Sequence, residues 1–195
     1  MFDDFIYHIK KYGDLDETSI SFLQKNVKFK HYKKNELILC AGKVPRYVYF
    51  VLDGMVRLFY SFDGEEKTAF FYNKNNFIWP KINSNHLVST QKNYMSINNS
   101  TLVLIDINAI QELNEKSYNF SQIYRNSKEQ ELIKYQQLIS YFVTLSPQER
   151  FKNLLEKNKS LFLKVPQQYI ASYIGISAET FSRIKKRIYQ NKIFV

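Results

Sequence analysis

The chain has 195 residues, 45% of them hydrophobic, and a formal net charge of +10 at pH 7. This length suits one medium domain or two small ones, and no apolar run of about 18 residues predicts a transmembrane helix. The N-terminus lacks the apolar core of a secretory signal, and Cys40, the only cysteine, excludes an internal disulfide. We therefore expect a cytoplasmic protein with no membrane partner, and the positive charge favours an anionic one.

Most of the excess charge lies in the last quarter of the chain. From Ser146 to the end, ten Lys and Arg residues face three acidic residues, which accounts for +7 of the total +10. A genome rich in A and T could supply some of the lysine, since the chain is also rich in Asn and Ile. The position of the charge is therefore more informative than its sum, and it singles out the C-terminal region.

The first 26 residues have apolar side chains at helical spacing. Gly13 separates two expected helices, and Asp16 is the expected N-cap of the second. From residue 27 to 107, short runs rich in Val, Ile, Tyr and Phe alternate with turn signals, including Asp53-Gly54 and Asp63-Gly64. Such a series of short strands predicts an antiparallel sandwich or barrel. We expect residues 73–92 to form a long loop with a short strand or turn near residues 77–79.

Two helices are expected next. Asp106 should cap a short helix that ends near Glu115, and a longer helix should run from about Tyr118 to Leu145. The long helix carries an apolar seam with spacings of 3, 4 and 3, formed by Tyr135, Leu138, Phe142 and Leu145. On spacing alone, this seam could pack within the chain or against a second copy of it.

The sequence "SPQE" at residues 146–149 has the pattern of a helix start and marks a domain boundary. Ser146 would be the N-cap, Pro147 the first helical residue, and Glu149 the partner in a capping box. The helix that follows should end near Asn158.

The stretch "QQYIASYIGISAETFSRIKKR" predicts two short helices joined at Gly175, in the pattern of a helix-turn-helix. Ser177 would cap the second helix, which should bury its apolar positions 181, 184 and 188. The opposite face would carry Glu179, Ser182 and Arg183 towards base edges in the major groove. The expected phosphate contacts are Gln168, Ser177, Thr180, Lys185, Lys186 and Arg187. A solvated basic surface helix is the alternative.

Taken together, these patterns resemble the Crp/Fnr family of regulators, which includes the cyclic-AMP receptor protein. The segment Glu179 to Arg183 resembles the Glu-Thr-x-Ser-Arg pattern of the family's recognition helix, and Gly42 and Gly54 match two glycines of its β-roll. The resemblance implies an α+β fold: an antiparallel β-roll of the cyclic-nucleotide-binding jelly-roll type over residues 1–116, a dimerisation helix over 117–145, and a helix-turn-helix domain over 146–195. It implies base contacts from Glu179, Ser182 and Arg183, and a homodimer through the long-helix seam. The partners would be double-stranded DNA and RNA polymerase.

The chain also departs from the family pattern. Residues 75–97, where a cyclic-nucleotide phosphate cassette would lie, contain no Gly-Glu pair and no arginine. Lys81 or Lys92 could supply charge, but neither offers the bidentate fork of arginine. We therefore expect no cyclic-AMP dependence and no cofactor, with an effector either unknown or absent. One cysteine is too few for the family's iron–sulfur members, and the C-terminal "QNKIFV" predicts that the winged hairpin is missing or short.

An apolar ligand pocket in the β-roll is a further possibility. Its expected residues are Phe70, Tyr72, Phe77, Trp79 and Lys92, although aromatic residues in strands are commonly plain core. The competing class is a cupin-like metal or small-molecule binding protein or enzyme, which needs clustered His and carboxylate ligands. His8, His31 and His86 are scattered, and no catalytic pattern stands out. We therefore predict no enzyme activity, no catalytic residues and no metal site.

Overall fold

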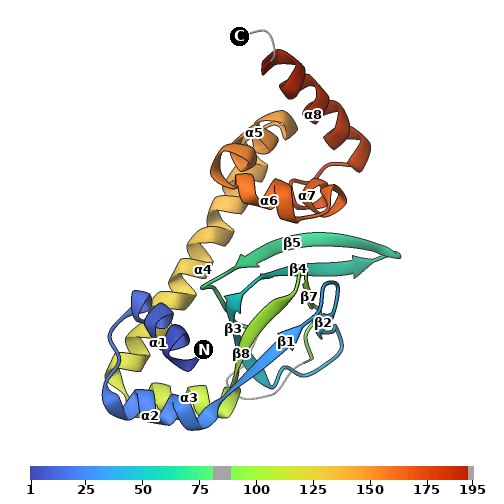
Figure 1. Ribbon diagram of the computed structural model, residues 1–195. Coiled ribbons are helices and arrows are strands. Elements are labelled where there is room, and N and C mark those ends of the chain that lie inside the picture. The colour runs from blue at the N-terminus through green and yellow to red at the C-terminus, as the bar shows by residue number, and fades with distance from the viewer. Residues whose placement is uncertain (81–88, 193–195) are drawn as a thin grey trace. The chain divides into compact units, whose positions relative to one another are not determined.

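The computed structural model describes residues 1–80 and 89–192 of the chain (Figure 1). Helical segments are α1 (Phe2–Ile9), the 3-10 turn η1 (Lys10–Tyr12), α2 (Glu17–Asn26), α3 (Ile107–Lys116), α4 (Tyr118–Thr144), α5 (Pro147–Lys157), α6 (Lys159–Lys164), α7 (Gln167–Tyr173) and α8 (Ala178–Lys192). Strands are β1 (Val27–Tyr32), β2 (Leu37–Leu39), β3 (Tyr47–Asp53), β4 (Met55–Phe62), β5 (Glu65–Asn73), β6 (Phe77–Ile78), β7 (Asn93–Ser96) and β8 (Ser100–Asp106).

The described chain divides into two compact units. One comprises Met1–Leu58 and Phe71–Ile133, and the other comprises Phe59–Phe70 and Lys134–Val195. The division falls inside α4 and inside β4 and β5. The predicted domain limits after residues 116 and 145 lie instead at the ends of α3 and α4, and the three-part division stays a prediction.

Two four-stranded sheets form the β-region that the sequence predicts. One has the order β1-β8-β3-β6 and the other the order β2-β7-β4-β5. The central pair of the first sheet is antiparallel, with Tyr49 opposite Leu104 and Phe50 opposite Val103. The turn residue Gly54 has φ +91, a value that glycine adopts readily. The mixed α+β fold with antiparallel sheets is confirmed.

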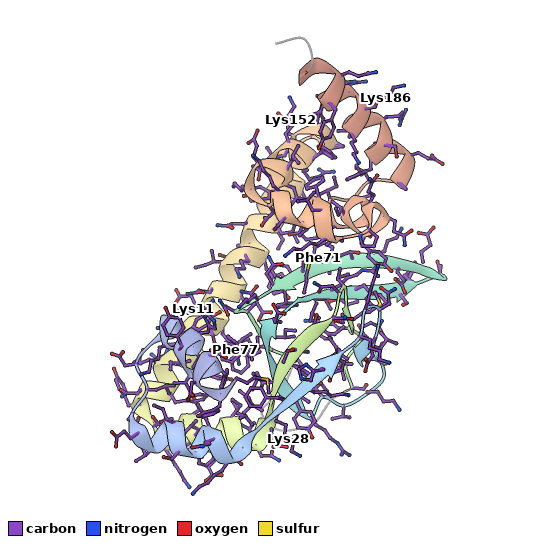
Figure 2. The ribbon with its side chains drawn as sticks, in the orientation of Figure 1. Lys11, Lys28, Phe71, Phe77, Lys152 and Lys186 are labelled. Carbon is purple, nitrogen blue, oxygen red and sulfur yellow. The ribbon has the colours of Figure 1, made fainter. Side chains whose placement is uncertain are left out.

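A hydrophobic core joins the N-terminal helices, the first sheet and the start of α4. The rings of Phe5 and Phe50 lie 5.3 Å apart, and those of Phe50 and Phe77 lie 4.9 Å apart. Trp79 continues the cluster to Tyr124 of α4, with ring centroids 5.0 Å apart. Figure 2 shows Phe77 beside α1. This core fixes the first half of α4 in its unit.

The helix boundaries follow the predicted caps. Asp16 accepts a hydrogen bond from Ser19 N at 2.7 Å, and Asp106 accepts one from Asn108 N at 2.8 Å. The capping box at the start of α5 is present, since Ser146 N donates to Glu149 Oε2 at 2.8 Å. Each of these hydrogen bonds satisfies a backbone N–H group at the start of its helix, which has no partner within the helix.

Candidate nucleic-acid interface

The helix pair α7–α8 is built on an apolar core of its own unit. The rings of Phe151 and Phe181 lie 5.1 Å apart, and those of Phe151 and Phe162 lie 5.2 Å apart. Phe162 belongs to α6, a short helix that the sequence did not predict. Buried alongside these rings are Leu161, Val165, Ile170, Ala171, Ile174, Ile184 and Ile188. Ala171 is buried between α7 and its neighbours, where a small side chain permits close packing of the helices, as the sequence predicts.

The turn between α7 and α8 has the predicted form. Gly175 has φ +71, and a Cβ placed there would lie 2.6 Å from Cε1 of Phe142. Ile176 N donates to Ala171 O at 3.0 Å, which closes the turn. Thr180 N then donates to Ser177 Oγ at 3.1 Å, so Ser177 is the N-cap of α8. The local sequence therefore fixes where the second helix begins.

The two faces of α8 separate as the sequence predicts. The exposed fraction of Phe181 is 1%, whereas Glu179, Ser182 and Arg183 are all exposed. Figure 2 shows the ammonium-bearing side chain of Lys186 projecting away from α8. The three residues expected to meet base edges are therefore free of the protein's own packing.

The expected phosphate-contacting residues lie at three places around this face. Gln168 is exposed on α7, and Lys186 and Arg187 are exposed on α8, where Lys185 is half-buried. Ser177 and Thr180 are tied to each other, since the Ser177 hydroxyl donates to Thr180 Oγ1 at 3.1 Å. Arg183 Nη2 donates to the same Thr180 Oγ1 at 3.2 Å. Thr180 thus holds the Arg183 side chain over the first turn of α8.

Arg150 is a structural residue of this interface that the sequence did not single out. Its Nε donates to Ile174 O at 2.9 Å, and its Nη1 donates to Leu145 O at 2.7 Å. Its guanidinium also lies over the ring of Phe142, 5.0 Å from the centroid. One side chain therefore joins the segment after α4 to the turn before α8. Nothing in the local sequence distinguishes it from a surface arginine.

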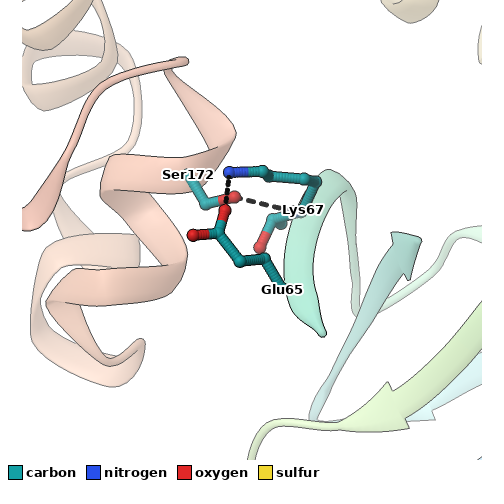
Figure 3. Close-up of polar contacts among 4 residues, drawn as sticks. Glu65, Lys67 and Ser172 are labelled. Atoms are coloured by element: carbon teal, nitrogen blue, oxygen red, sulfur yellow. Dashed lines mark hydrogen bonds and ion pairs between the residues drawn. The ribbon is translucent and has the colours of Figure 1, made fainter. Parts of the chain in front are cut away.

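A hydrogen bond also ties α7 to strand β5 within the same unit (Figure 3). Thr68 N donates to Ser172 Oγ at 2.8 Å, and the neighbouring Glu65 and Lys67 form an ion pair. Since β5 is an edge strand, this bond satisfies one backbone donor that no further strand covers. Burial raises the pKa of Tyr173, the last residue of α7, to about 12.

The predicted dimer seam of α4 is partly covered within its own unit, and its role in a dimer stays a prediction. The ring of Tyr135 packs on Phe70 at 4.8 Å, and Phe142 contacts Gly175, as described above. Leu138 and Leu145 are half-buried. Phe142 is nevertheless exposed by 43%, and three other apolar residues of α4 are exposed further, namely Leu132 (55%), Ile139 (63%) and Val143 (79%). Their spacing of seven and four residues places them in one stripe.

The residues expected to line a ligand pocket have varied surroundings, and the pocket stays a prediction. Phe77 and Trp79 belong to the hydrophobic core described above. Tyr72 Oη donates to Glu131 Oε1 at 2.6 Å, and Phe70 lies in the other unit. Lys92 is half-buried, and its backbone N donates to Thr90 Oγ1 at 3.0 Å.

Some of the predicted features lie outside the described residues or are absent within them. Lys81, His86 and the end of the "QNKIFV" segment fall outside. No group of three or more His, Cys, Asp or Glu side chains suited to a metal occurs in residues 1–80 and 89–192. Over the same residues, no helix is both long and apolar enough to cross a membrane.

The β-region matches a known domain family. Residues 29–115 match the model of the cyclic nucleotide-binding domain. No curated protein sequence matches the chain.

The fold as a whole is similar to several solved structures. FixK2 from Bradyrhizobium japonicum superimposes with a TM-score of 0.73 at 20% identity, covering 86% of each chain. A protein from Eubacterium rectale described as a Crp/Fnr-family regulator gives a TM-score of 0.72 at 17% identity, covering 92% of this chain and 85% of that one. A CooA variant from Carboxydothermus hydrogenoformans gives 0.68 at 16%, covering 95% and 84%. Residues 29–115 thus match the cyclic nucleotide-binding domain model, in a chain whose fold is similar to that of solved Crp/Fnr regulators.

Proposed function

We propose that this protein is a sequence-specific DNA-binding transcription regulator of the Crp/Fnr type and not an enzyme. The observation that carries the proposal is the division of α8: its apolar side chains are buried, while Glu179, Ser182 and Arg183 are exposed. An α-helix fits the major groove of B-DNA, and residues near its N-terminus reach the base edges. All three polar residues lie in the first two turns of α8.

The chemistry of these side chains suits base recognition. The guanidinium of Arg183 can donate two hydrogen bonds to guanine, and the carboxylate of Glu179 can accept one from the cytosine amino group. The cations of Lys185, Lys186 and Arg187 lie further along the same helix, where phosphates would flank the groove. Phosphate contacts position the helix, and base contacts specify the sequence.

We propose that two copies of the chain associate through α4. The exposed stripe of Leu132, Ile139 and Val143 supports this arrangement, and Phe142 of the predicted seam is also exposed, by 43%, although Tyr135 packs on Phe70. A two-fold dimer would carry two recognition helices and read a near-palindromic site with half-sites about one DNA turn apart. RNA polymerase is the protein partner that the Crp/Fnr resemblance suggests.

We further propose that regulation does not depend on cyclic AMP. The segment of residues 75–97 contains no arginine to pair with a cyclic phosphate. Isothermal titration calorimetry should show no heat of binding with cyclic AMP at micromolar protein. A micromolar dissociation constant would contradict the proposal. An effector of another chemical class, or none, is compatible with the described β-region.

The decisive experiment is selection of bound duplexes from random DNA. The expected result is enrichment of one sequence with two-fold symmetry, bound with an affinity that falls as salt concentration rises. Repeating the selection with cell metabolites added would show whether a small molecule changes binding. No enrichment of any sequence, or binding that does not depend on salt, would contradict the proposed function.

A further inference from the structure

A hollow of about 370 Å³ lies between the N-terminal turn of α5 and the recognition helix α8. Ser146 and Gln148 line it from α5, and Thr180, Arg183 and Arg187 line it from α8. The three residues of α8 are spaced by three and four positions, so they lie on one face of that helix. The hollow belongs to the same unit as the helix pair and opens beside the proposed DNA-reading face.

The lining of this hollow carries two guanidinium groups, and the carboxylate of Glu149 accepts hydrogen bonds from Ser146 at its edge. Arg183 and Arg187 are four residues apart on one helix face, where like charges repel each other. In the part of the chain that the structure describes, no carboxylate lines the hollow or pairs with either guanidinium. An anion in the hollow would relieve this repulsion. A phosphate matches it best, because the planar fork of guanidinium donors fits phosphate oxygens.

Gln148 connects the two sides of the hollow. Arg187 Nη1 donates to Gln148 Oε1 at 3.4 Å, a contact that joins α5 to α8. Since the amide oxygen accepts from Arg187, the amide NH₂ of Gln148 is left as a donor. Arg183 is held differently, by Thr180 within α8. Arg187 and Gln148 therefore form one group of donors that comes from two helices.

We propose that this hollow binds one phosphate of the DNA backbone, that Arg187 neutralises it, and that Gln148 positions Arg187 and donates a second hydrogen bond to it. The inference rests on the proposed function and adds the first turn of α5 as a second element against the DNA. A phosphate held from two helices fixes the register and angle of α8 in the groove. Gln148 is uncharged, so a search of the sequence for basic residues passes over it.

The salt dependence of DNA binding tests the role of Arg187 in the full-length chain. Arg187→Gln should reduce the slope of log K against log salt by about 0.9, the contribution of one phosphate on B-DNA. The matched control is Arg125→Gln, which removes an exposed arginine of α4 and should leave the slope unchanged. Thermal melts should show that both variants fold like the wild-type protein.

A double-mutant cycle tests the role of Gln148. Gln148→Ala should weaken binding roughly 2- to 10-fold, the range for one hydrogen bond, and this loss should be smaller in an Arg187→Gln background, where only the direct bond of Gln148 to the phosphate remains to be lost. Gln148→Glu should weaken binding more, although its carboxylate would hold Arg187 at least as well, because a negative charge then faces the phosphate. This variant separates phosphate binding from a merely structural role of position 148.

Uncharged methylphosphonate linkages, placed one at a time in the selected duplex, identify the phosphate itself. One position in each half-site should weaken wild-type binding clearly more than binding of Arg187→Gln, which keeps only the hydrogen bond from Gln148. If the chain binds DNA but the losses from Gln148→Ala and Arg187→Gln simply add, the inference is overturned while the proposed function stands. Stabilisation of the wild-type protein, but not of Arg187→Gln, by inorganic phosphate, together with equal DNA binding by the two proteins, would assign the hollow to a free anion and also overturn the inference.

Discussion

The turn between β3 and β4 gives a sharp test of the β-region, because Gly54 leaves no room for a side chain. Its φ is +91, and a Cβ placed there would lie 2.1 Å from Ser100 Oγ and 2.7 Å from Ser100 Cα. Ser100 cannot move away easily. Its hydroxyl accepts hydrogen bonds from Met55 N at 3.2 Å and from Ser96 Oγ at 2.7 Å, and the residue is buried. We therefore expect Gly54→Ala to destabilise the protein strongly.

The magnitude follows from two costs. A non-glycine residue in the left-handed region costs about 1–2 kcal/mol, and forcing extra atoms into a packed site costs typically about 1–3 kcal/mol more. The sum is roughly 2–5 kcal/mol, against a typical total stability of about 5–15 kcal/mol. The matched control is Gly64→Ala, in the second Asp-Gly turn. Gly64 has φ +78, and a Cβ placed there would meet no atom within 4 Å, so only the first cost applies.

Urea denaturation followed by circular dichroism measures both variants. The midpoint should fall in both, and further in Gly54→Ala, with an unchanged m-value. The difference between the two variants should be at least about 1 kcal/mol, the lower end of the packing cost. Equal losses would show that Ser100 does not constrain this turn, and a larger loss in Gly64→Ala would refute the reasoning altogether.

Three further predictions concern the interface, the dimer and acid stability. Arg183→Ala should reduce discrimination by about 1–3 kcal/mol at one base pair of the selected site; equal weakening on all duplexes, measured by titration, would make Arg183 a phosphate contact instead. Ile139→Lys should shift the protein towards the monomer in sedimentation, whereas Gln137→Lys, also exposed on α4, should not; an unshifted dimer would place the interface elsewhere. Hydrogen bonds, led by that from the Thr18 hydroxyl, lower the pKa of Asp16 below its usual range. This contribution to stability is therefore present above the unfolded-state pKa of about 4 and is lost as pH falls below it. Asp16→Asn should flatten that acid loss in urea titrations; an identical pH profile would show that another carboxyl is responsible.

Most of the β-region could be predicted because its local signals agree with each other. The run at residues 27–32 became β1 without a shift of either end, since Val27 and Phe29 alternate there with lysines and the turn signal Lys34-Asn35 follows. The helix pair was equally clear, because Gly175, the cap at Ser177 and the apolar spacing of α8 all place its boundaries. In such segments, residues close together in the sequence are enough to determine where each helix or strand begins and ends.

Other features depend on residues far away in the sequence, and the sequence alone could not place them. The apolar spacing of Tyr135 to Leu145 was correct as a pattern, but only the fold shows that Phe70 and Gly175 already cover part of it. The roles of Arg150 and Gln148 likewise come from partners on other helices. The helix α6 was missed because six residues are too few for a periodic signal.

The contacts of Arg150 have a mechanical consequence. Its two hydrogen bonds end on carbonyl oxygens that belong to the segment after α4 and to the turn before α8. Because a guanidinium is planar and rigid, it couples the end of α4 to the turn that precedes α8. If α8 binds DNA as proposed, a rotation at the end of α4 would therefore change the angle at which α8 meets the duplex.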